Sequence, residues 1–145
     1  MIIMRAAALD EMEASYISAI NNNAADDMVK GDVVKWDTAL ATGETLGKSV
    51  SDADAASLLV AGVVRGAGID NSTSVAKGDL VCVQVSGFCD NVTTDQGVSD
   101  GDALMAGTAV ADTGTLGTDD GAWFGVAMAD DSTALLSAAY LKGNI

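Results

Sequence analysis

The chain has 145 residues, 49% of them hydrophobic, with 21 acidic and 7 basic side chains and a net charge of −14 at pH 7. This length and apolar content fit one folded domain with its own core and exclude general disorder. The acidic surface repels phosphate backbones and anionic lipid headgroups, so nucleic acids and membrane surfaces are poor partners.

No apolar run in the sequence approaches the roughly 18 residues needed to cross a bilayer. The first 20 residues hold a single Arg and turn acidic by Asp10. They therefore lack the basic segment and clean apolar stretch of a secretory signal, and we expect synthesis in a reducing cytoplasm.

Residues 1–28 differ in pattern from the rest of the chain. An apolar stripe at helical spacing predicts a short helix that the Asn21–Asn23 triplet ends. The stripe consists of Leu9, Met12, Tyr16, Ile17 and Ile20, and an apolar tip with Ile2, Ile3 and Met4 precedes it. We interpret 1–28 as an N-terminal arm, which either docks on its own domain as a helix or strand or reaches a neighbouring subunit.

From residue 29 onward the pattern is that of a β domain spanning 29–145. Many of the 16 glycines lie next to Asp, Ser, Asn or Lys, a composition typical of turns, and the chain contains no Pro. A helical turn is an alternative for 51–57, and 113–121 is predicted to be a loop. The expected strands are 33–36, 58–64, 80–85, 88–94, 103–105, 108–112, 123–128 and 134–141.

The predicted strand 80–85 alternates, with Val81, Val83 and Val85 on one face. Ser86-Gly87 is predicted to be a hairpin turn that returns the chain as strand 88–94. The fold class expected from these patterns is mainly β, a small barrel or sandwich of short antiparallel strands with the helix-containing arm.

Two phrases recur along the chain. V-x-x-G-D-x-(V/L) occurs at 75–81 and 98–104 and, in shortened form, at 29–33, while an apolar-Gly-Val phrase occurs at 61–64 and 124–127. Each Gly-Asp is expected to be a turn that feeds a new strand, with the Asp bonding nearby backbone N–H groups. The order of turn, strand, gap and buried Gly-Val strand thus appears twice, which indicates related hairpins.

The residues available for chemistry are few. The chain has no His, which removes the commonest general base and metal ligand. The two cysteines, Cys82 and Cys89, have no second pair for a zinc site, and the predicted hairpin sets Cys82 opposite Asn91, so two small strand hydrophobes are favoured over a disulfide. Oxygen-rich residues 90–102 fail the calcium-loop pattern. We therefore predict no catalytic, cofactor or metal site.

The two tryptophans, Trp36 and Trp123, are the remaining candidates for contact with another protein. Trp is enriched among interface anchors. A core position is the alternative for each.

Several phrases taken together resemble the small head-decoration (cement) proteins of tailed bacteriophages. They are G-D-V-V-x-W-D at 31–37, L-V-A-G-V-V at 59–64, V-A-K-G-D-L-V-x-V-Q-V-S-G at 75–87, V-x-x-G-D-A-L at 98–104 and F-G-V-A-M-A-D at 124–130. The likeness spans roughly 31–141 and leaves out the predicted helix.

This resemblance implies a non-enzymatic virion protein with a β-barrel body, made in the host cytoplasm. Its partner would be the major capsid protein, and it would bind the capsid exterior as a homotrimer at three-fold positions and stabilise the shell. The arm and the two tryptophans are the contact residues that we predict. Alternatives are a virion-surface host- or glycan-binding or fibre-base module, a carboxylate-based hydrolase and another assembly protein.

Overall fold

A computed structural model of the chain describes residues 14–23, 27–37, 48–54, 60–69, 73–94, 98–106, 114–116, 123–128 and 136–142. These residues form nine strands and no helix, so none of their elements is a helix long and apolar enough to span a membrane. The strands are β1 Ser15–Asn21, β2 Val33–Trp36, β3 Ser49–Asp52, β4 Val60–Gly66, β5 Leu80–Thr93, β6 Ala103–Ala106, β7 Gly114–Leu116, β8 Gly125–Ala127 and β9 Leu136–Lys142.

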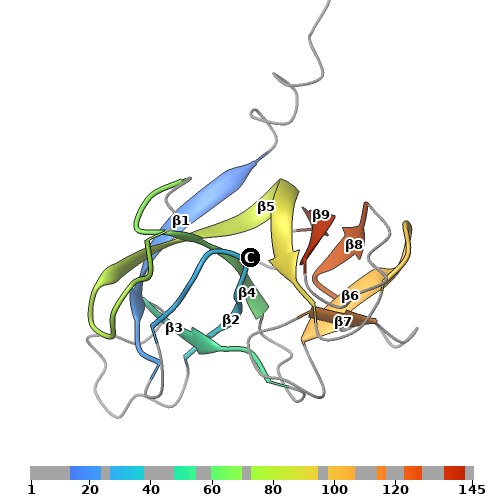
Figure 1. Cartoon of the computed structure of the whole chain (residues 1–145). Helices are drawn as coiled ribbons and strands as arrows, with labels where there is room; N and C mark the ends of the chain where they lie inside the picture. The colour runs from blue at the N-terminus through green and yellow to red at the C-terminus, as the bar shows by residue number, and fades with distance from the viewer. Residues whose placement is uncertain are drawn as a thin grey trace, which may run out of the picture.

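The first five strands close into a barrel, which lies on the left of Figure 1. The ring runs β1-β3-β2-β4-β5 and closes because β1 pairs with β5 as well as with β3. All pairs are antiparallel except β1 with β3. Small aliphatic side chains fill the interior: Ala19, Met28, Val34, Val50, Ala61, Val64, Val75, Val81, Val83 and Val85.

Strand β5 does not end at Ser86-Gly87 but bends there and continues to Thr93. The predicted hairpin is therefore wrong: residues 88–93 extend the same strand and pair with β9. Gly87 has a φ of 87°, and the buried Gln84 side chain donates to the carbonyls of Ser86 (3.2 Å) and Phe88 (2.7 Å). The amide thus satisfies two backbone acceptors at the bend, so β5 can belong to two sheets.

Beyond the bend, β5 leads a second sheet in the order β5-β9-β8-β6-β7, on the right of Figure 1. The strand pairing within this second sheet repeats the strand pairing within the barrel. Val33 faces Val63 and Val34 faces Gly62 between β2 and β4, while Ala103 faces Val126 and Leu104 faces Gly125 between β6 and β8. The β3–β2–β4–β5 arrangement of the first unit therefore corresponds to β7–β6–β8–β9 in the second, and the repetition predicted from the sequence phrases is confirmed.

The three Gly-Asp phrases form the same turn. In each, the Asp N–H donates to the carbonyl three residues earlier, and Gly31, Gly78 and Gly101 have φ of 102°, 92° and 91°. The carboxylates of Asp32 and Asp102 also accept from the N–H of the turn's first residue, at 2.7 Å in both cases. Because these φ values suit glycine alone, the phrase encodes the turn directly.

Each turn also holds one residue of another strand by two hydrogen bonds. The Gly N–H and the Asp carbonyl bracket Val64 of β4, Asn21 of β1 and Ala127 of β8 respectively, at 2.8–2.9 Å. The first phrase is not shortened: Met28 takes the place of Val75 and Val98, and all three are buried. Met28 and Val75 also bridge each other.

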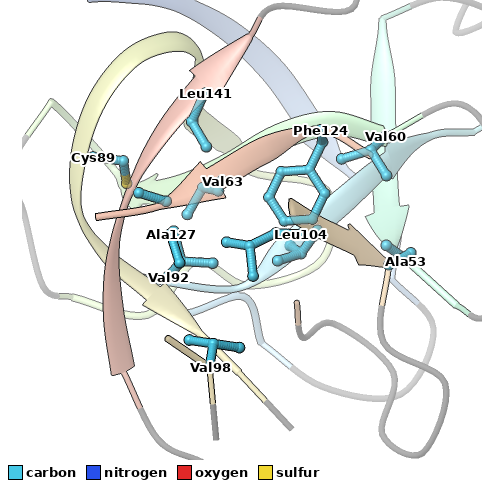
Figure 2. Close-up of a cluster of buried hydrophobic side chains, with 13 residues drawn as sticks. Ala53, Val60, Val63, Cys89, Val92, Val98, Leu104, Phe124, Ala127 and Leu141 are labelled. Atoms are coloured by element: carbon cyan, nitrogen blue, oxygen red, sulfur yellow. The ribbon is translucent and has the colours of Figure 1, made fainter. Parts of the chain in front are cut away.

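A second hydrophobic core joins the two units. It contains Val33, Val60 and Val63 from the outer side of the first barrel together with the inner side chains of the second sheet. Figure 2 shows Val60 and Val63 beside Phe124, Leu104 and Ala127. The second sheet therefore packs on β2 and β4, and the described strands form one body.

The helix expected over 9–20 is wrong for residues 15–20, which lie in β1. Residues 15–21 thus dock on their own barrel, one of the two alternatives for this segment. The helical turn considered for 51–57 gives way to β3 at 51–52, and β7 lies inside the predicted loop 113–121. The expected strand 108–112 lies outside the described residues, and the division of the chain at residue 28 stays a prediction.

Candidate interaction surfaces

The predicted contact residues of β1 lie on two different faces of the strand. Ile17 packs against the barrel interior on the side of the buried Ala19, whereas Tyr16 and Ile20 are half-buried on the opposite side. Ile20 faces Leu80 across the β1–β5 pair, and Leu80 is 63% exposed. The apolar stripe is therefore divided, and Ile17 is part of the core packing. Ile2, Ile3, Met4, Leu9 and Met12 lie outside the described residues.

The Asn21–Asn23 triplet fixes the end of β1 inside the barrel. The Asn21 amide is fully buried, donates to the carbonyl of Val75 (2.8 Å) and accepts from the N–H of Asn23 (2.7 Å). Asn22 donates to the carboxylate of Asp37 and Asn23 to that of Asp52. A triplet interpreted from the sequence as a helix end therefore ties β1 to Asp37 after β2, to β3 and to the Gly78-Asp79 turn.

The two tryptophans occupy different settings, and both are half-buried. Trp36 ends β2, packs against the barrel core and faces Val50. Trp123 lies just before β8, with the Lys142 ammonium 4.1 Å from its ring centroid. A contact of this kind contributes about 0.5–1 kcal/mol at an exposed site. Trp36 thus belongs to the core surroundings and Trp123 to a surface.

The outer face of the second sheet carries a row of side chains that were not predicted to form a surface. Across its strands Phe88 faces Tyr140, Tyr140 faces Val126, and Val126 faces Ala103. Tyr140 is 40% exposed. The alternation Ala139-Tyr140-Leu141 is the sequence signal that could have found it, because Ala139 and Leu141 are buried and Tyr140 therefore points to the outer face.

Arg65, at the end of β4, is a buried charge that forms an ion pair with Asp90. Its Nη1 lies 2.7 Å from Asp90 Oδ1 and its Nε donates to the carbonyl of Ile69 (3.1 Å). Burial alone would lower the pKa of Arg65, but the interactions with Asp90 and Cys89 together outweigh it, so the net shift is upward. The pair links β4 to the second half of β5 and has a structural role.

The two thiols are free and sit near this arginine. Burial raises the pKa of Cys89, which is fully buried, and also that of the half-buried Cys82, although Arg65 opposes both shifts. Both thiols are therefore protonated at neutral pH, which is the unreactive form. Within the described ranges no three His, Cys, Asp or Glu side chains converge on a metal-binding group.

We expect Cys89 in a Cys82→Ser variant to react with a thiol reagent at pH 8 at least about a hundredfold more slowly in the native state than in denaturant, because modification requires opening of the core. The measurement is absorbance of the released thiolate over time. The matched Cys89→Ser variant, which keeps the half-buried Cys82, should react faster. Rapid native reaction of Cys89 would contradict its placement in the core.

No protein-family model matches the sequence, and no curated protein matches it. Among solved structures, the fold is similar to the head fibre gp8.5 N base of bacteriophage phi29, with a TM-score of 0.53 and 16% sequence identity. The match covers 89% of this chain and 94% of that chain. At this level of identity the likeness establishes a shared fold.

Proposed function

We propose that the chain is a non-enzymatic structural protein of a bacteriophage virion that binds the outer surface of the capsid and stabilises it. The observation that carries the proposal is the fold likeness to a phage head-fibre base over nearly the whole of both chains. The sequence resemblance to head-decoration proteins supports the same class independently. Its partner would be the major capsid protein, at three-fold positions with the chain as a homotrimer.

The physical properties of the chain suit such a role. The charge of −14 keeps closely spaced copies from aggregating. Both thiols are protonated, and the carboxylates of Asp32 and Asp102 are used in turns. Many contacts of modest strength, repeated over a symmetric shell, add up to stable attachment through avidity.

A second candidate is a base that carries a fibre, which the description of the phi29 protein as a head-fibre base favours. Both candidates place the chain outside the capsid. Electron microscopy of decorated heads separates them, because a base carries a projecting fibre whereas a decoration protein adds only low density on the shell. Glycan binding by the purified chain would favour a host-binding module instead.

The direct test is co-sedimentation of the purified protein with phage heads that lack it. The proposal predicts saturable binding at a stoichiometry near that of the capsid protein and heads that withstand heating or chelation better. If the protein stays in the supernatant of such heads, the capsid-binding proposal is wrong.

We further expect deletion of residues 2–13 to lower occupancy on heads at least about tenfold, because the loss of an apolar contact is multiplied over a repeated lattice. The deletion stops short of β1, so circular dichroism and thermal melting should be unchanged. A deletion of 2–20 is the matched control for folding: it removes β1 and should open the barrel. Full occupancy by the 2–13 deletion would show that the arm does not bind the capsid.

A further inference from the structure

The outer face of the second sheet is made of Phe88, Trp123, Val126, Met128 and Tyr140. The strand register sets Phe88 beside Tyr140 and Tyr140 beside Val126. The alternate residues Cys89, Ala127, Ala139 and Leu141 are in the core, so Phe88, Val126, Met128 and Tyr140 lie on the side away from it. Trp123 joins them through Lys142, which lies on the same side of β9 as Tyr140 and whose ammonium lies over the Trp123 ring.

This face is unusually aromatic for the chain. The sequence holds two Trp, two Tyr and two Phe, and three of these residues are Phe88, Trp123 and Tyr140. Tyr140 is 40% and Met128 48% exposed, while the other members are half-buried. Tyr and Trp are the residues most enriched among interface hot spots, so the composition is that of a contact surface.

The corresponding face of the first unit, on the outer side of the barrel, is buried in this structure. Val33, Val63 and Gln84 occupy the positions of Ala103, Val126 and Tyr140, because the strand pairings correspond. The first three are 0%, 0% and 1% exposed. Val33 and Val63 are buried because the second sheet of the same chain packs on them. In the first unit, therefore, this face is an interface with another copy of the same structural unit.

Charge favours the same kind of occupant for the second unit. None of the five side chains is charged, in a chain whose net charge is −14. A cation, Lys142, contacts this face through its ammonium, which lies over the Trp123 ring. Copies that meet through this face therefore bring neutral side chains together, which adds little charge repulsion at the contact.

We propose that the outer face of the second sheet is the surface through which copies of this chain associate. The inference deepens the proposed function, since it names the contact by which the chain would form its homo-oligomer. Tyr140 lies at the centre of this contact, between Phe88 and Val126. The occupant is another copy of the chain, and in the proposed homotrimer the three copies of this face meet around the three-fold axis.

The test is sedimentation velocity of the full chain between about 1 µM and 1 mM, the range in which contacts of modest size saturate. The wild-type chain is expected to form one defined oligomer. Tyr140→Asp should raise the dissociation constant at least about thirtyfold, because it removes a central aromatic contact and adds charge repulsion. Met128→Asp, at a more exposed position of the same face, is expected to weaken association in the same direction.

Leu80→Asp is the matched control. It adds the same charge at an apolar residue of β5 that is 63% exposed but belongs to the first barrel. It should leave association unchanged, and thermal melting should show that all three variants fold. If Tyr140→Asp does not fold, Met128→Asp decides the question.

A wild-type chain that stays monomeric at every concentration overturns the proposal, and so does an oligomer that Tyr140→Asp and Met128→Asp leave intact. Equal weakening by Leu80→Asp would show a general charge effect and also overturn it. The measurement uses the chain alone, so failure here leaves capsid binding to be judged by co-sedimentation with heads. If the chain is monomeric and Tyr140→Asp loses binding to heads, the occupant is the capsid protein.

Discussion

Replacing Gly62 with alanine is expected to lower the free energy of unfolding by about 4 kcal/mol or more, the range reached by the most damaging single substitutions. Gly62 lies at a bulge in β4, where the register to β2 shifts. A Cβ at this position would stand 2.1 Å from the carbonyl oxygen of Gln84 and 2.9 Å from a methyl of Val83. Since the oxygen belongs to the backbone of β5, relief requires the two strands to separate.

The consequence extends beyond one strand pair. Gln84 directs its amide to the bend of β5, so a displaced β5 disturbs the point where the barrel joins the second sheet. Urea unfolding followed by circular dichroism measures the effect. A domain of this size is stable by only about 5–15 kcal/mol, so we expect a substantial unfolded fraction of the variant at 37 °C.

Gly68→Ala is the control for this substitution, because no atom lies within 4 Å of a Cβ at that position. Its stability should stay within about 0.5 kcal/mol of the wild type. Gly125→Ala, at the corresponding position of β8, should fall between the two, since its Cβ would lie 2.9 Å from the Tyr140 carbonyl oxygen. Equal stability of the Gly62 and Gly68 variants would mean that β4 and β5 are not packed this closely.

Features set by short stretches of sequence were predictable. The Gly-Asp turns depend on a glycine with positive φ and an aspartate that bonds its own turn, and both requirements are visible in the sequence. The same holds for β2 at Val33–Trp36 and for the apolar run that became β4, which is buried along its whole length. These elements carry their cause within about seven residues, so pattern alone identifies them.

Features set by distant contacts were not predictable. Ser86-Gly87 has the composition of a hairpin turn, yet the chain continues because β9 pairs with residues 86–93. The stripe that included Tyr16, Ile17 and Ile20 fits a helix, but pairing with β5 makes it a strand and sends Ile17 inward. In both cases the partner strand lies more than 40 residues away, and tertiary pairing outweighs local preference.

The outer face of the second sheet, our proposed association surface, was missed for a related reason. The outer face of the second sheet draws its residues from three segments, around Phe88, Val126 and Tyr140, and only the strand register brings them together. Trp36, in contrast, was selected by residue type, and the structure places it against the barrel core. Residue type identifies candidates, whereas topology decides which of them share a face.

Asn21→Ala is expected to cost about 2–4 kcal/mol of folding stability, because two buried backbone groups lose their partner and each costs about 1–3 kcal/mol when unsatisfied. The Asn21 side chain is 0% exposed and bonds the carbonyl of Val75 and the N–H of Asn23. The bond to Val75 holds the strand that closes the barrel against the Gly78-Asp79 turn, and the bond from the Asn23 N–H fixes the chain where that strand ends. Thermal or urea unfolding gives the change, and Asn21→Asp, which keeps the acceptor but loses the donor, should lie nearer to Asn21→Ala than to the wild type.

Asn91 provides a matched control within the same molecule. It precedes Val98 by the same spacing that separates Asn21 from Met28, and so it is the corresponding residue of the second unit. Its Oδ1 is buried without a hydrogen-bond partner in the described residues, 3.0 Å from where a Cβ on Gly31 would stand. Asn91→Ala removes an unsatisfied buried oxygen, so it should change stability by less than about 0.5 kcal/mol or raise it.

The difference between these two variants tests how the two units have diverged. In the first unit the asparagine fastens the strand that closes the ring, whereas in the second the corresponding stretch of β5 is held from outside, by the hydrogen bond from the Thr93 N–H to the Gly31 carbonyl. If Asn91→Ala destabilised the protein as much as Asn21→Ala, the second unit would depend on its asparagine in the same way as the first. A smaller loss of stability in Asn91→Ala than in Asn21→Ala would instead show that the closed barrel fastens its closing strand with its own side chain. The second sheet, in contrast, completes its core by packing on the outer face of that barrel.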